Sequence, residues 1–155
     1  MIQRKQTVYL SLTILLSLLF LTGSNLNFTD KSGSVMRVAF GGLLRNSGGE
    51  GFELIGRYLP LSVLMTLIPV ISLITIMLYK NRKIQMRLAL SVIILVAGLT
   101  IVLCYYSWSV ITEYGADIIP GFKMVLPLLM LVFAVLAYRG IRKDDALVKS
   151  YDRLR

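Results

Sequence analysis

The chain has 155 residues, of which 56% are apolar, and it carries 17 basic residues against eight acidic ones. So high an apolar fraction excludes an ordinary water-soluble globule and indicates lipid as the solvent of most of the chain. The absence of histidine excludes His-dependent catalytic pairs and bis-His haem ligation within the chain, and a lone cysteine, Cys104, excludes an internal disulfide.

Four apolar segments are predicted to cross a membrane as helices, over residues 8–22, 58–79, 88–111 and 118–138. The second has 22 residues and would extend about 33 Å as an α-helix, enough for a hydrocarbon core of about 30 Å. The fourth reaches full length only if Lys123 extends its ammonium toward the lipid headgroups. We therefore expect a single four-span membrane domain over residues 1–155.

The first apolar segment is open to a second interpretation. The start MIQRK, a short apolar run and Thr22-Gly23-Ser24 also fit a signal peptide with a small-residue cleavage site. In that case the mature chain would begin at Asn25 and keep three spans. We expect retention, with the segment as the first span.

The basic residues are distributed unevenly around these spans. Twelve of them precede the first span, connect the second to the third, or follow the fourth: Arg4, Lys5, Lys80, Arg82, Lys83, Arg87, Arg139, Arg142, Lys143, Lys149, Arg153 and Arg155. The segments on the other side hold five basic and five acidic residues, with no net charge. Because basic residues are retained on the cytoplasmic side, both termini are predicted to be cytoplasmic.

The predicted external loop, residues 23–57, contains eight glycines, which make a long helix improbable. Within it, SVMRVAFGGLL at residues 34–44 is apolar and β-branched enough for a short strand, an interfacial segment or at most a small hairpin. The predicted fold class is therefore an all-α integral membrane protein with one glycine-rich external loop and a short cytoplasmic loop over residues 80–87.

The tail, residues 139–155, is predicted to form a short amphipathic helix. Leu147, Tyr151 and Leu154 recur at helical spacing, and Asp145 and Lys149 form an i, i+4 pair on a more polar face. Such a helix would lie on the inner headgroups or against another cytoplasmic surface. Nucleic acid is not an expected partner, because aromatic interleaving and RNA-binding motifs are absent.

Basic residues near the surface attract anionic lipid by about 1 kcal/mol each. The predicted contact site for anionic headgroups or a partner comprises the basic residues of the central loop and the tail: Lys80, Arg82, Lys83, Arg87, Arg139, Arg142, Lys143, Lys149, Arg153 and Arg155.

The side chains of the predicted spans suggest structural roles. Pro69 is expected to kink the second span, and the serines and threonines of the spans are expected to serve as hydrogen-bonding or close-packing positions between helices. Tyrosines and Trp108 at the span ends are typical of an aromatic belt at the headgroup level. No catalytic residue, cofactor site or metal site is predicted.

Three basic stretches carry a family resemblance: MIQRKQTVYL at the start, LYKNRKIQMRL at residues 78–88, and IRKDDALVKSYDRLR at the end. Together they resemble domain-of-unknown-function family 4293, four-span proteins of Bacteroidetes-type bacteria. The resemblance covers the whole chain and implies the four-span architecture and a multi-pass location in the bacterial inner membrane. It brings no activity and no site residues.

The function expected from these observations is that of a non-enzymatic accessory or scaffold subunit of a larger membrane assembly, with a membrane-protein partner or further copies of the chain. The alternative is a small homo-oligomeric carrier or channel for a neutral or lipophilic solute, for which Pro69 and the polar residues near it would form the pathway. An enzyme is not expected, because no nucleophile–base pair or buried acid occurs in the spans.

Overall fold

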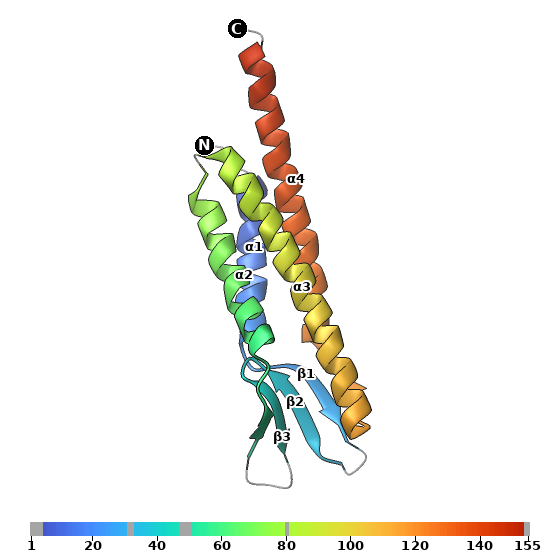
Figure 1. Cartoon of the computed structure of the whole chain (residues 1–155). Coiled ribbons are helices and arrows are strands. Elements are labelled where there is room, and N and C mark those ends of the chain that lie inside the picture. The colour runs from blue at the N-terminus through green and yellow to red at the C-terminus, as the bar shows by residue number, and fades with distance from the viewer. Residues whose placement is uncertain (1–4, 31–32, 47–50, 80, 154–155) are drawn as a thin grey trace.

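The computed structural model of the chain describes residues 5–30, 33–46, 51–79 and 81–153. Its helices form an elongated bundle, and a β-sheet closes one end of that bundle (Figure 1). The helices are α1 (Lys5–Leu21), α2 (Leu59–Met77), α3 (Arg82–Tyr114) and α4 (Leu126–Arg153), and a 3-10 turn, η1 (Phe122–Val125), precedes α4.

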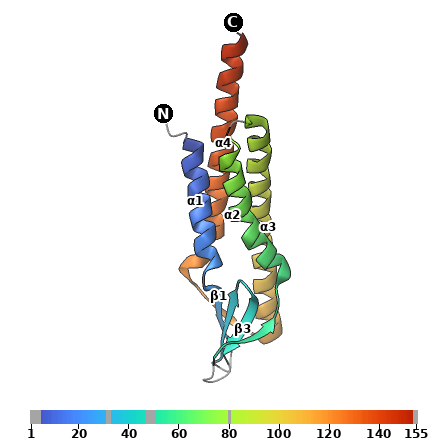
Figure 2. The same ribbon diagram turned by 90° about the vertical axis from the view of Figure 1, so that its left-hand side faces the viewer.

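Each helix of the bundle packs against two others. α1 lies against α2 and α4, and α3 also lies against α2 and α4, so that the four helices surround a common interior (Figure 2). Among the described residues, α2, α3 and the segment Phe122–Ala146 are long and apolar enough to cross a membrane, and Gln6–Leu21 is a shorter apolar helix.

The sheet is built from both connections that lie at this end of the bundle. The α1–α2 connection supplies β1 (Ser24–Thr29), β2 (Val35–Ala39), β3 (Gly42–Asn46) and β4 (Glu53–Gly56), and the α3–α4 connection supplies β5 (Asp117–Ile119). All pairs are antiparallel, in the order β4-β3-β2-β1-β5. The prediction of an all-α fold is therefore wrong.

The sheet forms because its strands have one apolar face to bury. Phe28 of β1 is paired with Met36 of β2, and both side chains are fully buried, whereas Arg37 between the buried positions of β2 is exposed. The glycines shape this sheet: Gly42 has a φ of +135°, and a Cβ there would lie 1.9 Å from the carbonyl oxygen of Gly56. Only glycine allows β3 and β4 to approach so closely, so this glycine supports the sheet.

One apolar core runs from the sheet into the bundle. It joins buried residues of the sheet, such as Phe28 and Val38, to buried residues of the helices, such as Leu61, Val96 and Met130. The Ser62 hydroxyl also donates to the carbonyl oxygen of Phe40, which fastens α2 to the turn between β2 and β3. The sheet is therefore packed on the bundle as a continuation of its interior.

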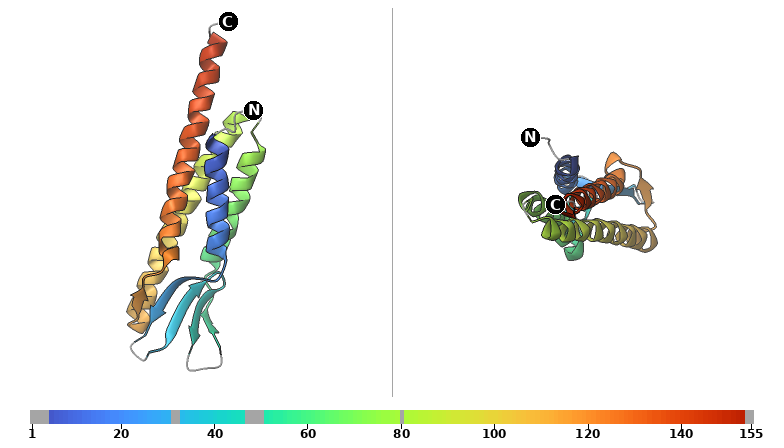
Figure 3. Two further views of the ribbon diagram at one scale, coloured as in Figure 1. Left: turned by 180° about the vertical axis from the view of Figure 1, so that it is seen from behind. Right: turned by 90° about the horizontal axis from the view of Figure 1, so that it is seen from above.

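The fourth helix differs from the prediction at both ends. Ile118, expected in the fourth span, lies in β5, and α4 starts only at Leu126. At the other end, α4 continues through Gly140 to Arg153, 28 residues in all, or about 42 Å at 1.5 Å per residue. The tail is thus no separate short helix: it extends α4 away from the bundle (Figures 1 and 3).

Candidate functional site

The predicted contact residues that the structure describes gather at the end of the bundle opposite the sheet, which we call the basic end (Figure 1). Arg82, Lys83 and Arg87 lie in the first turns of α3, directly after the α2–α3 connection. Arg139, Arg142 and Lys143 lie on α4 where it leaves the bundle. Lys149 and Arg153 belong to α4 with side chains outside the described part, and Lys80 and Arg155 lie outside the described residues.

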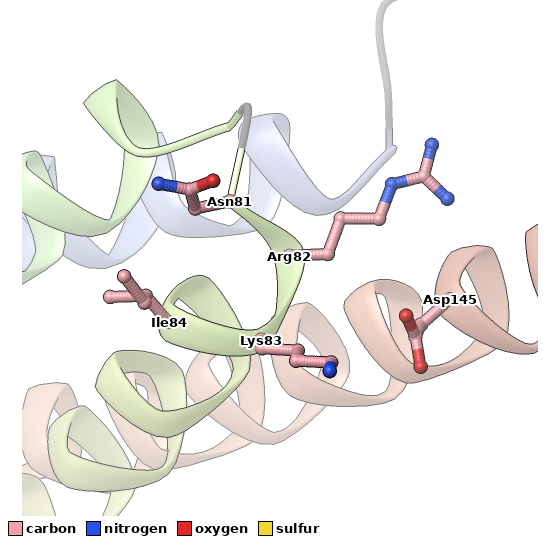
Figure 4. A pocket seen from close by; sticks show the side chains of 5 residues that line it. All are labelled: Asn81, Arg82, Lys83, Ile84 and Asp145. Atoms are coloured by element: carbon pink, nitrogen blue, oxygen red, sulfur yellow. The ribbon is translucent and has the colours of Figure 1, made fainter.

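A pocket of about 450 Å³ lies at the basic end between the start of α3 and α4. Asn81, Arg82, Lys83 and Ile84 line it from one side and Asp145 from the other (Figure 4). The Nη1 atom of Arg82 donates to the backbone carbonyl oxygen of Asp144 at 3.0 Å. Arg82 is partly buried and fastens α3 to α4, whereas Lys83 is exposed. Lys83 is therefore the freer of the two cations to contact a phosphate.

A second group of cations lies farther along α4. Arg139, Arg142 and Lys143 are all exposed, and their i, i+3 and i, i+4 spacings place them on one face of the helix. Lysine and arginine in such a group suit the phosphates of anionic lipids or an acidic protein surface. The arrangement offers binding and orientation of an anionic group.

Buried amides lie beneath the basic end. Gln6 of α1 and Gln85 of α3 are each 2% exposed, and Gln85 donates from Nε2 to the carbonyl oxygen of Thr75 at 3.1 Å. Within the described part of the chain, the Oε1 atoms of both glutamines have no hydrogen-bond partner. Amides do not ionise near neutral pH, so these side chains can join helices but cannot relay protons.

Gly140 marks a close approach of α1 and α4, which gives a first testable expectation. A Cβ at Gly140 would lie 3.3 Å from Cβ of Gln6 and 3.6 Å from its Cα. Gly140→Leu should therefore force the two helices apart and lower the free energy of unfolding by about 1–3 kcal/mol. Denaturation in detergent micelles, followed by circular dichroism, measures the loss. Gly98→Leu is the matched control, because an added Cβ at this helical glycine meets nothing within 4 Å, and an equal loss there would contradict the close packing.

Several hydroxyl side chains of the helices form hydrogen bonds within their own helix, where the prediction expected bonds between helices or close-packing positions. Thr13, Thr75 and Thr100 each donate to the carbonyl oxygen four residues earlier in their own helix, at 2.7–2.9 Å. Ser17 and Ser91 donate to the carbonyl oxygen three residues earlier, and Ser107 donates to that of the residue four earlier. These side chains do not join neighbouring helices, because their single proton is already used locally.

Aromatic side chains gather at the sheet end of the bundle. The rings of Tyr58 and Tyr106 are stacked, with centroids 3.8 Å apart, and Tyr105 meets Tyr106 edge-on at 5.5 Å.

Several features of the basic end could not be found by counting charges. Asp145, Asn81 and Ile84 complete the pocket, yet none belongs to the predicted contact set. The partner of Arg82 is a backbone carbonyl, for which the sequence contains no signal. Among the described residues, no group of three His, Cys, Asp or Glu side chains could hold a metal ion.

Comparison with known proteins agrees with the resemblance carried by the basic stretches. No curated protein and no solved structure matches the chain. The family described as Domain of unknown function (DUF4293) matches residues 2–154, and the chain therefore belongs to this family.

Proposed function

We propose that this protein is an integral inner-membrane protein with four spans and both ends in the cytoplasm, and that it acts as a non-enzymatic accessory or scaffold subunit. Three long apolar helices support the membrane location. The packing of α1 against α2 and α4 supports a fourth span, since α1 occupies one corner of the bundle. The gathering of cations at the basic end supports the orientation.

The interior of the bundle favours a scaffold over a carrier. Pro69 is itself buried, and the core of the bundle contains Met65 and Ile68 of α2, Val96 and Leu99 of α3, and Met130 of α4, each at most 2% exposed. A solute path needs polar groups or water along its length. Apolar side chains therefore fill the core of the bundle. We expect a single chain to function through contacts at its surface.

The observation that carries the proposal is the open edge of β4. Among the described residues this strand ends the sheet and has no strand partner on its outer side, and its residues Leu54 and Ile55 are 45% and 44% exposed. Proteins usually protect such edges, because unpaired N–H and C=O groups recruit further strands. We infer that an extended segment of a partner protein adds to β4.

The charges next to β4 specify that segment further. Glu53 and Arg57 are exposed at the two ends of the strand, and neither has an ion-pair partner among the described residues. A complementary partner segment would run antiparallel to β4. It would place a basic residue opposite Glu53, an acidic residue opposite Arg57 and apolar residues between them.

A second copy of the chain fits this edge less well than a different protein. Two identical strands in one antiparallel sheet are related by a twofold axis perpendicular to that sheet. The strands run away from the bundle roughly along its length (Figure 3), so this axis would turn the second bundle upside down. Two copies inserted in the same direction in one membrane cannot pair through β4 in this way.

Substitution of the β4 edge tests the proposal. With the partner purified through its complex with this protein in mild detergent, Ile55→Asp should lower the affinity about tenfold or more, because a buried contact gains a charge. Ile119→Asp is the matched control, since Ile119 is 42% exposed on β5 at the opposite edge. A photoreactive residue at position 55 should cross-link to the same partner. Unchanged affinity of the Ile55 variant, or cross-links only between two copies of this chain, would refute the proposal.

A further inference from the structure

We propose that a crevice between α3 and α4 binds one acyl chain of a membrane phospholipid, with Lys123 contacting the lipid phosphate. This proposal rests on the placement of the bundle in a membrane and is independent of the scaffold role. It assigns a ligand to the sheet end of the bundle, away from the basic end.

The crevice has a volume of about 300 Å³ and is lined by residues of α3 and α4, two helices that diverge toward the sheet (Figure 3, right). Its floor is made by Phe20 of α1, Leu26 of β1 and Leu103 of α3, each less than a tenth exposed. The walls are completed by α3, η1 and the start of α4, through Thr100, Cys104, Ser107, Lys123, Met124, Val125, Pro127 and Leu128. This volume lies at the lower end of the roughly 300–1,000 Å³ range of ligand pockets.

The hydroxyl groups in the wall do not make the crevice polar. Thr100 donates to the carbonyl oxygen of Val96 at 2.9 Å, and Ser107 donates to that of Leu103 at 2.7 Å. Pro127 has no backbone N–H to offer. With its donors used inside α3, this wall suits a hydrocarbon chain and offers little to a polar solute.

Lys123 determines the chemistry at the rim. Among the described residues that line the crevice it is the only charged one. Its ammonium donates to the carbonyl oxygen of Thr22, just after the end of α1, which holds the charge at the sheet side of the crevice. An ammonium has three donors, so two stay available for phosphate oxygens.

The depth of the crevice matches a phospholipid in its ordinary orientation. Trp108 and Phe122, next in the sequence to the lining residues Ser107 and Lys123, are 71% and 70% exposed, as expected of aromatic residues at the headgroup level. Thr100 and Leu128 lie farther from the sheet, toward the middle of the bundle. A lipid with its phosphate at Lys123 would therefore extend its chain along Cys104 toward Thr100, in the direction of the bilayer centre.

The native Cys104 provides a test that needs no substitution in the site. Alkylation of Cys104 by N-ethylmaleimide in detergent should become several-fold slower when phosphatidylglycerol is added. The control is a Cys104→Ser, Ile101→Cys variant, because Ile101 is 69% exposed on α3 and does not line the crevice. We expect less than twofold protection at position 101. Equal protection at both positions, or no protection at position 104, would overturn the proposal. Either result would mean that lipid only surrounds the protein and does not occupy the crevice.

Native mass spectrometry gives an independent readout of the same site. The wild-type protein should retain one phosphatidylglycerol, Ser107→Phe should lose it by filling the crevice, and Ile101→Phe should keep it. Lys123→Gln should weaken phosphatidylglycerol about fivefold and leave diacylglycerol, which has no phosphate, unchanged. Equal retention by the Ser107 and Ile101 variants, or equal loss of both lipids on changing Lys123, would contradict the assignment.

Discussion

Phe28→Ala is expected to lower the free energy of unfolding by about 3–5 kcal/mol, the usual cost of truncating a fully buried aromatic side chain. Phe28 is 0% exposed and lies in the middle of β1, opposite Met36 of β2 and Ile118 of β5. Its ring belongs to the core that joins the sheet to the helices, so the cavity would loosen both. Denaturation of the purified protein in mixed micelles, followed by circular dichroism, measures the effect.

Phe122→Ala is the matched control for this experiment. Phe122 is 70% exposed, so its truncation removes little packing and should change the free energy of unfolding by less than about 0.5 kcal/mol. Equal losses for the two variants would mean that Phe28 does not pack between sheet and bundle.

The orientation of the bundle predicts an all-or-none labelling pattern. Single cysteines replace exposed residues at the two ends, Glu53 and Asp117 at the sheet end and Asn81 and Ala146 at the basic end, in a Cys104→Ser background. A membrane-impermeant thiol reagent should label only the two sheet-end positions in intact spheroplasts, because the proposed orientation, based on the positive-inside rule, puts the basic end in the cytoplasm. All four should label after permeabilisation.

Each labelling site tests a separate part of the topology. Labelling at position 146 in intact spheroplasts would place the end of α4 outside and overturn the proposed orientation. Exchanging Arg139, Arg142 and Lys143 for glutamine should leave the pattern unchanged, because the cations before the first span and in the central loop still hold the earlier helices in place. A changed pattern would show that α4 itself determines the orientation.

The helices of this fold were easier to predict than its sheet, for a physical reason. Long apolar runs report helices locally, whereas β5 has only three residues, Asp117–Ile119, and exists because β1 lies beside it. The stretch SVMRVAFGGLL did indicate a strand or hairpin, and it contains β2 and the start of β3. The alternation of Leu26 and Phe28 in SNLNFT was a further period-2 signal, but the intervening asparagines and the nearby glycines favoured a loop.

The candidate sites show the same division between local and distant information. The positions of the cations relative to the spans predicted a charged group from sequence alone, and the described members of that group lie at one end of the bundle. The bond from Arg82 to the Asp144 carbonyl depends on α4 continuing past Gly140, which a glycine followed by charged residues did not indicate. The crevice beside Lys123 depends on the angle at which α3 and α4 diverge, and single-chain patterns contain no measure of that angle.

The pairing of β5 with β1 also sets an order for biosynthesis. β4 ends at Gly56 and β5 begins at Asp117. After β4 is complete, about 61 further residues must therefore be synthesised before β5 can pair with β1. This takes roughly 3–12 s at 5–20 residues per second. During that time the β1 edge of a four-stranded sheet is open to any other nascent strand. The sheet can be completed only after α3 has been synthesised and the chain has returned to the sheet end of the bundle, so a complete sheet requires that α3 already lies in the bundle.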